Sequence, residues 1–192
     1  MERSVTSHLE LDVTSPATLV LEIAVAQEHL DAGATESLVL TAAGEAVEAR
    51  ELRASHGTRL HVLDAPVGPV SVDYRATVTE RLDPPPVDEL DLLTYLRPSR
   101  YCESDSLAPT AHSEFTGLRG AALLTAVGSW VGTRLSYVSG ASLPTDGAVR
   151  TLLARQGVCR DYAHLSVALL RALDVPARLA AVYAPGLSPM DF

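Results

Sequence analysis

The spacing of hydrophobic residues changes near residue 83 of this 192-residue chain. Before that point, apolar and polar side chains alternate in short runs, as in strands with one face in a core and one in water. The clearest runs are Leu9–Val13, Leu19–Val25 and Val70–Thr79, and weaker ones lie at 37–40, 46–52 and 59–63. Because Gly, Pro and Asp separate these runs, they predict an antiparallel β-sandwich.

A proline run, Asp83-Pro84-Pro85-Pro86, forms a stiff, extended connector. Beyond it we expect helices over 87–96, 118–135, 145–155 and 159–173, followed by a strand over 178–183. The predicted fold class is therefore α+β. Its parts are a β-sandwich domain (1–82), a linker (83–117) and a helical domain (118–192).

Composition excludes several classes of protein. The net charge is −9 and all 15 basic residues are scattered arginines, so we expect no nucleic-acid partner. No run reaches the roughly 18 apolar residues of a membrane span, and residues 1–9 do not resemble a signal peptide. We therefore expect no membrane partner, a cytoplasmic location and two free thiols. Two cysteines and dispersed histidines predict no metal site, and we expect no cofactor.

The most informative segment surrounds Cys159. Gly157 ends a loop and Cys159 begins a helix, which places a thiol at the positive end of a helix dipole, where the thiolate is favoured. On a helical wheel Tyr162 and Ala163 share the face of Cys159. His164 points roughly 140° away, in a polar stripe with two arginines, so it is poorly placed to accept the proton of the thiol. We expect His164 to bond to backbone or to an acid.

The charged residues next to the cysteine have less specific interpretations. Asp161 lies in the first turn, where an acidic side chain complements the helix dipole. Arg160 is expected to pair with a carboxylate that the sequence alone does not identify.

The run Gly-x-Cys-x-Asp-x-Ala, followed by Val175-Pro176-Ala177-Arg178, resembles the nucleophile helix of the transglutaminase-like superfamily of papain-related cysteine enzymes. Segments 130–137, 140–142 and 146–153 resemble the helices and loop that precede this helix in bacterial members. Residues 96–102 resemble their linker, and the first 80 residues resemble, more weakly, their β-rich N-terminal region. The specificity of the resemblance is concentrated in residues 128–185.

The resemblance implies a Cys-His-Asp arrangement in which Cys159 attacks a carboxamide or peptide carbonyl and forms a thioester. In the family the histidine follows the strand after Pro-Ala-Arg, and this chain ends at Phe192 before it. Two alternatives stay open: the chain is a fragment of a longer enzyme, or it is a natural short form. Because both lack the histidine and the acid, we expect the chain itself to be catalytically inert.

The resemblance implies one catalytic residue, a set of residues that line the substrate site and a set of motif residues with structural roles. Cys159 is the nucleophile, and the candidates for lining the substrate site are Trp130, Tyr137, Tyr162 and Ala163, although for Trp130 and Tyr137 a place in the core is the more common alternative. The residues of the motif with structural roles are Gly157, Arg160, Asp161, His164, Pro176 and Arg178.

The resemblance leaves the function open among protease, amidase and transglutaminase, because a fold does not fix a reaction. We expect hydrolysis of a protein or peptide substrate rather than transfer to an amine. The alternative is a non-catalytic binding or structural module with a degenerate transglutaminase-like domain. A terminal strand at 178–183 without sheet neighbours would expose an apolar edge, so a homo-oligomer through this strand is also a candidate.

Overall fold

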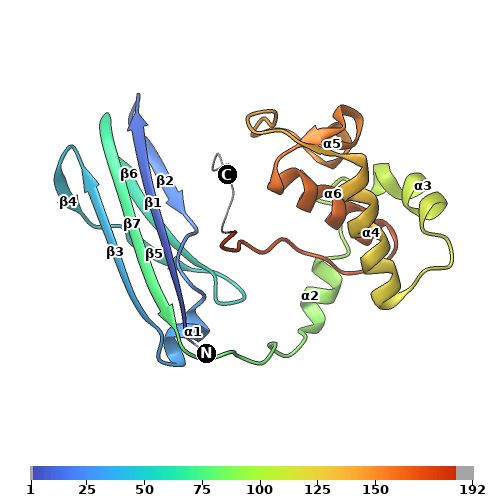
Figure 1. Cartoon of the computed structure of the whole chain (residues 1–192), viewed down its shortest axis with the longest axis horizontal. Helices are drawn as coiled ribbons and strands as arrows, with labels where there is room; N and C mark the ends of the chain where they lie inside the picture. Colours follow the sequence, from blue (N-terminus) through green and yellow to red (C-terminus); the bar gives the residue numbers. More distant parts are fainter. Residues whose placement is uncertain (1, 185–192) are drawn as a thin grey trace. The chain divides into compact units, whose positions relative to one another are not determined.

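The computed structural model describes residues 2–184, and the chain divides into two compact units, Met1–Pro84 and Pro85–Phe192 (Figure 1). The first unit contains two antiparallel sheets, with strand orders β1-β7-β3-β4 and β2-β6-β5. The strands of the first sheet are β1 (Arg3–Val13), β7 (Gly68–Val78), β3 (Thr35–Ala42) and β4 (Glu45–Val47). Those of the second are β2 (Ala17–Leu21), β6 (Arg59–Ala65) and β5 (Arg50–Arg53). A short helix, α1 (Gln27–Asp31), completes the unit.

The two sheets share one apolar core, which confirms the predicted sandwich. Strand β7 lies between β1 and β3, and its residues from Val70 to Val78 are buried at every second position. Leu63 and Ala65 of β6, in the other sheet, join the same cluster of buried side chains. The period-2 pattern of the sequence therefore marks the inward faces.

Two features of this unit differ from the sequence expectation. The run predicted over 46–52 is two strands, β4 and β5, because the chain crosses from one sheet to the other between them. Helix α1 was not predicted, since a five-residue helix without a buried residue has no hydrophobic period to detect.

A polar cluster also joins the two sheets. Arg59 of β6 is 5% exposed, and its guanidinium donates to both carboxylate oxygens of Glu36 on β3, at 2.8 and 2.7 Å. It donates as well to Glu51 of β5 at 2.7 Å, while the Tyr74 hydroxyl donates to Glu36 at 2.8 Å. Hydrogen bonds from Arg59 hold the pKa values of both carboxyl groups below their ordinary value.

We predict that Arg59→Met lowers the free energy of unfolding by about 2–4 kcal/mol, because it leaves the partly buried Glu36 carboxylate without its cation and Glu51 with only the exposed Arg53. Urea unfolding followed by far-ultraviolet circular dichroism measures this loss. Arg53→Met is the matched control: Arg53 also contacts Glu51, at 3.2 Å, but its side chain is 70% exposed. The control should change stability by less than about 1 kcal/mol. Equal losses in the two variants would contradict the assignment.

The second unit is built around one helix, α6 (Cys159–Ala172), whose Leu165, Ala168 and Leu169 are fully buried. It packs against α3, α4 and α5. The other helices are α2 (Glu89–Thr94), α3 (Ser104–Glu114), α4 (Gly120–Arg134) and α5 (Ala148–Ala154). Two short strands, β8 (Ser136–Tyr137) and β9 (Gln156–Gly157), pair in parallel.

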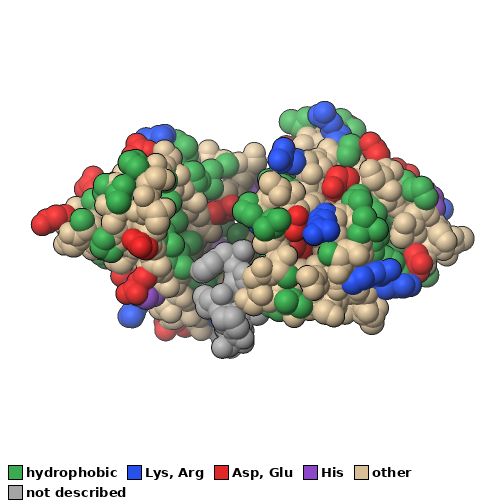
Figure 2. All heavy atoms as spheres, turned by 90° about the horizontal axis from the view of Figure 1, so that it is seen from above, with side chains coloured by type: hydrophobic (Ala, Val, Ile, Leu, Met, Phe, Trp, Pro, Cys, Tyr) green, Lys and Arg blue, Asp and Glu red, His purple; other side chains and the backbone are tan. Residues whose placement is uncertain are grey.

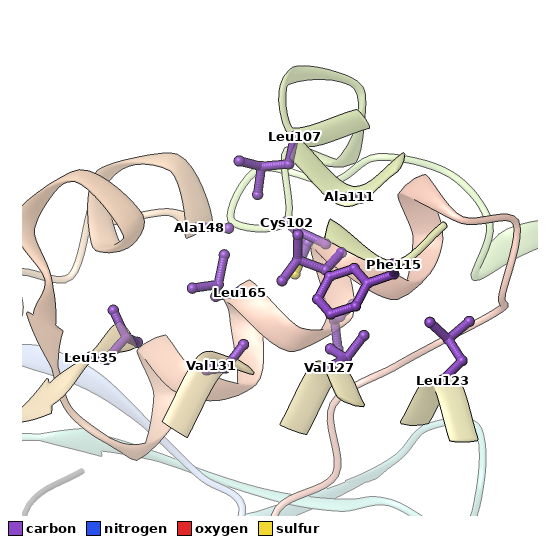
Figure 3. Close-up of a cluster of buried hydrophobic side chains, with 13 residues drawn as sticks. Cys102, Leu107, Ala111, Phe115, Leu123, Val127, Val131, Leu135, Ala148 and Leu165 are labelled. Atoms are coloured by element: carbon purple, nitrogen blue, oxygen red, sulfur yellow. The ribbon is translucent and has the colours of Figure 1, made fainter. Parts of the chain in front are cut away.

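Figure 3 shows how α4 contributes to the core of this unit. Its buried side chains Leu123, Val127 and Val131 recur every four residues and so form one stripe along the helix. In the figure this stripe points toward Phe115 and Leu165. The long apolar helix predicted over 118–135 thus packs one face against the core, while most of its other residues are exposed.

The linker predicted over 83–117 is wrong for residues 104–115. These residues form α3 and its end, and Leu107, Ala111 and Phe115 are buried in the core cluster that includes α6. The sequence signal is weak because Pro109 lies inside the helix and polar residues occupy much of its length. The segment is therefore part of the α6 unit.

The strand predicted over 178–183 is also wrong, and with it the basis for a homo-oligomer through that strand. Residues 175–184 have no strand assignment. A strand needs a neighbouring strand for its ladder of hydrogen bonds, and no strand within residues 2–184 pairs with this segment.

Acidic, basic and apolar side chains are interspersed over the face of each unit that Figure 2 presents. None of the helices formed by residues 2–184 is both long and apolar enough to span a bilayer.

Candidate active site

Cys159 is the first residue of α6, where the sequence places it, and its side chain is exposed. The preceding residue, Val158, is extended and buried, so the chain turns sharply from β9 into the helix. Strand β9 is held by β8, with Tyr137 opposite Gly157 and the Val138 N–H donating to the Gly157 carbonyl at 3.1 Å. The thiol therefore lies at the solvent-facing end of a helix that is otherwise embedded in the core.

The first turn of α6 is held by a buried carboxylate. Asp161 is 1% exposed, and its Oδ2 accepts the N–H of Val158 at 2.8 Å. Its Oδ1 accepts the hydroxyl of Ser142 at 3.0 Å. The Arg160 guanidinium donates to the Ser142 hydroxyl oxygen at 2.6 Å and to the Leu143 carbonyl at 2.8 Å. Asp161 therefore caps the helix and also connects it to the loop that follows β8.

Gly157 is required by the close approach of this carboxylate. A Cβ at position 157 would lie 2.7 Å from the Cβ of Asp161 and 2.8 Å from its Oδ2. The backbone of Gly157 is not in the left-handed region, so conformational freedom is not the reason for the glycine. Sequence reasoning treated this glycine as the end of a loop and missed its role as space for Asp161.

We predict that Gly157→Ala lowers the free energy of unfolding by about 1–3 kcal/mol, because the added methyl group displaces Asp161 from its cap position. Urea unfolding followed by Trp130 fluorescence reports on this unit, since Trp130 is the single tryptophan of the chain. Gly128→Ala in α4 is the control, because a Cβ there meets nothing within 4 Å. It should stabilise by about 0.5–1 kcal/mol. Loss of stability in the control alone would contradict this explanation.

Two residues predicted to line the substrate site lie together. The rings of Tyr137 and Tyr162 have centroids 6.2 Å apart and are tilted by 39°. Tyr162 is one turn after Cys159 on α6, and Tyr137 is opposite Gly157 on β8. Burial raises the pKa of Tyr162. Ala163, on the same face of the helix, is half-buried.

Trp130, the third aromatic candidate, has contacts of a different kind. Its indole N–H donates to Glu114 at 2.8 Å, its ring meets Phe115 edge-on at 5.9 Å, and the Arg134 guanidinium lies 5.0 Å from the ring centroid. These partners belong to α4 and to the end of α3. The contacts therefore favour the core interpretation of Trp130 over the substrate-site interpretation.

His164 is buried and stacks on Tyr101, with ring centroids 5.3 Å apart and planes within 10°. Its Nδ1 is buried and has no hydrogen-bond partner within the described part of the chain, so the expected bond from this atom to backbone or to an acid is absent. The contact with the Tyr101 ring is found where a hydrogen bond was expected. Burial, and then the charge of Arg160, lower the pKa of His164, so the ring is favoured in its neutral form.

We predict that the unit containing His164 loses stability as the pH falls below about 6.5, toward the lowered folded-state pKa of this ring. The folded-state pKa of His164 is lowered, so over this window the unfolded chain binds more protons and unfolding is favoured. His164→Phe keeps a ring against Tyr101 and should flatten this part of the pH profile, as measured by urea unfolding with Trp130 fluorescence. His112→Gln, an exposed change on α3, should leave the slope as it is. An unchanged slope in His164→Phe would assign the titration elsewhere.

The remaining polar residue of the α6 stripe, Arg171, connects the helix to two other segments. It is buried, and its Nε donates to the Ala177 carbonyl at 2.8 Å. Its Nη1 donates to the Arg97 carbonyl at 2.8 Å and to the Ser99 hydroxyl at 3.3 Å. Sequence reasoning did not select Arg171, although its place in the polar stripe of a buried helix was the available signal.

The remaining residues considered for the site are Pro176, Arg178 and Cys102. Pro176 and Arg178 are exposed in the irregular segment after α6. The other cysteine, Cys102, is 1% exposed in the core, and burial raises the pKa of its thiol. In residues 2–184 no three His, Cys, Asp or Glu side chains gather as they would around a metal ion.

The part of the chain that contains Cys159 is similar to known proteins. Residues 116–191 match the family described as the transglutaminase-like superfamily. An uncharacterized protein of Mycobacterium tuberculosis is 39% identical over 69 residues, which are 36% of this chain and 21% of that protein. An uncharacterized protein of Mycobacterium leprae is 30% identical over 60 residues, which are 31% of this chain and 22% of the relative. The matches therefore span about a fifth of the length of these relatives.

A solved structure extends the similarity to both units. The crystal structure of a "Putative Cysteine Protease" from Cytophaga hutchinsonii superposes with a TM-score of 0.74 at 29% sequence identity. The match covers 92% of this chain and 65% of that one.

Proposed function

Residues 116–191 belong to the transglutaminase-like superfamily, and we propose that Cys159 is the nucleophile of a cysteine-dependent acyl-transfer reaction in the whole protein. The observation that carries the proposal is the position of this thiol, exposed at the first residue of a helix that is otherwise buried. A nucleophile needs access on one side and a rigid support on the other, and this position combines both. The similarity to a protein named as a cysteine protease supports the same chemistry.

In the proposed reaction the Cys159 thiolate attacks the carbonyl carbon of a carboxamide or peptide bond. A C–S bond forms and the carbonyl electron pair moves to oxygen, where the N–H of Cys159, which has no partner within the helix, can stabilise the charge. Collapse of this intermediate breaks the C–N bond, and the amine leaves with a proton from the general acid. Water then attacks the thioester, releases the carboxylic acid and returns the proton to sulfur.

The general base of this scheme is not among the histidines of the α6 unit. His164 is stacked on Tyr101 inside the core, and His112 on α3 bonds through Nδ1 to the Ala108 carbonyl. We therefore propose that neither His112 nor His164 is the base that activates Cys159. We propose a peptide or protein substrate, hydrolysis rather than amine transfer, no nucleic-acid or membrane partner, and a cytoplasmic location.

If Cys159 is a nucleophile of this kind, it should react with iodoacetamide faster than a cysteine in an unstructured peptide at pH 6.5, as nucleophilic cysteines do. Intact-mass kinetics on Cys102→Ser and Cys159→Ser variants separate the two thiols. We expect labelling at Cys159 to exceed the peptide by about tenfold, within the range that cysteine environments produce. Cys102 should label only as fast as the protein opens, since it is buried in the core.

The competing function is a non-catalytic binding or structural module. It is favoured by the positions of His164 and His112, because neither histidine is assigned as the base. Under that hypothesis Cys159 would react no faster than the peptide thiol. We also expect no turnover of amides by this chain, because neither His112 nor His164 is proposed as the base. Amide hydrolysis that disappears in Cys159→Ala would show that a base within residues 1–192 is sufficient.

A further inference from the structure

We propose that Ser142, Asp161 and Arg160 form a latch that fixes the loop 138–147 beside Cys159 and so limits the size of the acyl group that reaches the thiol. The proposal rests on the assignment of Cys159 as a nucleophile. It adds a specificity-determining role for Ser142, a residue that the family resemblance and the sequence motif do not assign.

The loop is anchored to residues on both sides of the cysteine. At its start, the Val138 N–H donates to the carbonyl of Gly157, two residues before the thiol. At its middle, Ser142 and the Leu143 carbonyl bond to the two residues that follow Cys159. The loop 138–147 therefore runs along the segment 157–161 that carries the sulfur.

Ser142 is the central contact because its single hydroxyl group serves both partners. It donates its proton to Asp161 Oδ1 at 3.0 Å and accepts from Arg160 Nη2 at 2.6 Å. The direction is settled by chemistry, since a carboxylate can only accept and a guanidinium can only donate. Because Asp161 is 1% exposed and also caps α6, the loop is tied to the most firmly held point of the helix start.

The loop is internally ordered as well. The Asp146 carboxylate accepts the Leu143 N–H at 3.1 Å, and the Leu143 carbonyl accepts the Asp146 N–H at 3.0 Å. The Ala141 N–H donates to the Val138 carbonyl at 3.2 Å. These short-range bonds fix the internal conformation of the loop. Its position relative to the start of α6 then depends on the latch.

The side chains of the loop contribute little to the core. Leu143 is 57% exposed and Val138 is 38% exposed. Release of the latch should therefore move the loop without unfolding the unit, and the change should appear in access to Cys159. This separates a role in specificity from a role in folding.

The test compares alkylation of Cys159 by a small reagent, iodoacetamide, with alkylation by a bulky one, N-(1-pyrenyl)maleimide, in a Cys102→Ser background. Both reagents are neutral and both react with the thiolate, so the ratio of the two rates cancels any change in thiolate fraction. The ratio measured with an unstructured cysteine peptide corrects for intrinsic reactivity. In the parent chain we expect the bulky reagent to be disfavoured relative to that peptide.

Ser142→Ala should raise the ratio of bulky to small reagent by about fivefold, the scale expected for loss of hydrogen bonds at one side chain. Arg160→Met, which removes the guanidinium that donates to Ser142 and to the Leu143 carbonyl, should shift the ratio in the same direction. Ser142→Thr keeps a hydroxyl group and should retain the parent ratio. Ser136→Ala, an exposed change on β8, is the matched control and should have no effect. Trp130 fluorescence verifies that each variant is folded.

An unchanged ratio in both Ser142→Ala and Arg160→Met would overturn the latch, even if Cys159 reacts rapidly. Equal rises in Ser142→Ala and Ser136→Ala would also overturn it. Slow alkylation of Cys159 by both reagents, no faster than the peptide, would instead reject the proposed nucleophile. The two failures are therefore distinguishable.

Discussion

A buried carboxylate at the start of α6 determines the local structure around the thiol. An ionised side chain that is 1% exposed needs hydrogen bonds to compensate for lost hydration, and Asp161 has them from Val158 and Ser142. Its negative charge also lies at the positive end of the helix dipole. Gly157 follows from this arrangement, because any larger residue would occupy the space of the carboxylate. The structures of Gly157, Asp161 and the exposed Cys159 between them thus depend on one another.

The two faces of α6 explain why the helix that carries Cys159 is so firmly supported. Its apolar face, with Leu165 and Leu169, is fully buried in the core. Its polar stripe also lies against protein, since His164 stacks on Tyr101 and Arg171 bonds to the Arg97 carbonyl. Segment 95–103, which precedes α3, therefore covers the side of the helix that a wheel alone would assign to solvent. Only the N-terminal end of the helix is left open, at Cys159.

The sequence predicted the features that depend on a regular hydrophobic period and on local chemistry. The alternation in β7, the apolar stripe of α4 and the start of α6 at Cys159 were all readable from residue types. Helix α3 was missed because Pro109 and its polar residues hide the helical period, although tertiary packing buries one face. The strand at 178–183 was expected from composition, but strand formation depends on a neighbour that composition does not reveal. The Ser142–Asp161 bond joins residues 19 positions apart, which no local pattern specifies.

The position of His164 has a consequence for how the reaction would have to be assembled. A general base must approach the sulfur from outside the α6 core, because the histidine on α6 itself is already buried against Tyr101. Burial and the charge of Arg160 lower the pKa of His164, and a ring that favours its neutral form is a poor partner for a thiolate, which is stabilised by a positive charge. The open end of α6 is bordered on one side by the aromatic pair Tyr137 and Tyr162 and by the loop that begins after β8. In the proposed reaction, a base would therefore approach Cys159 from a side that β8 and its loop leave free.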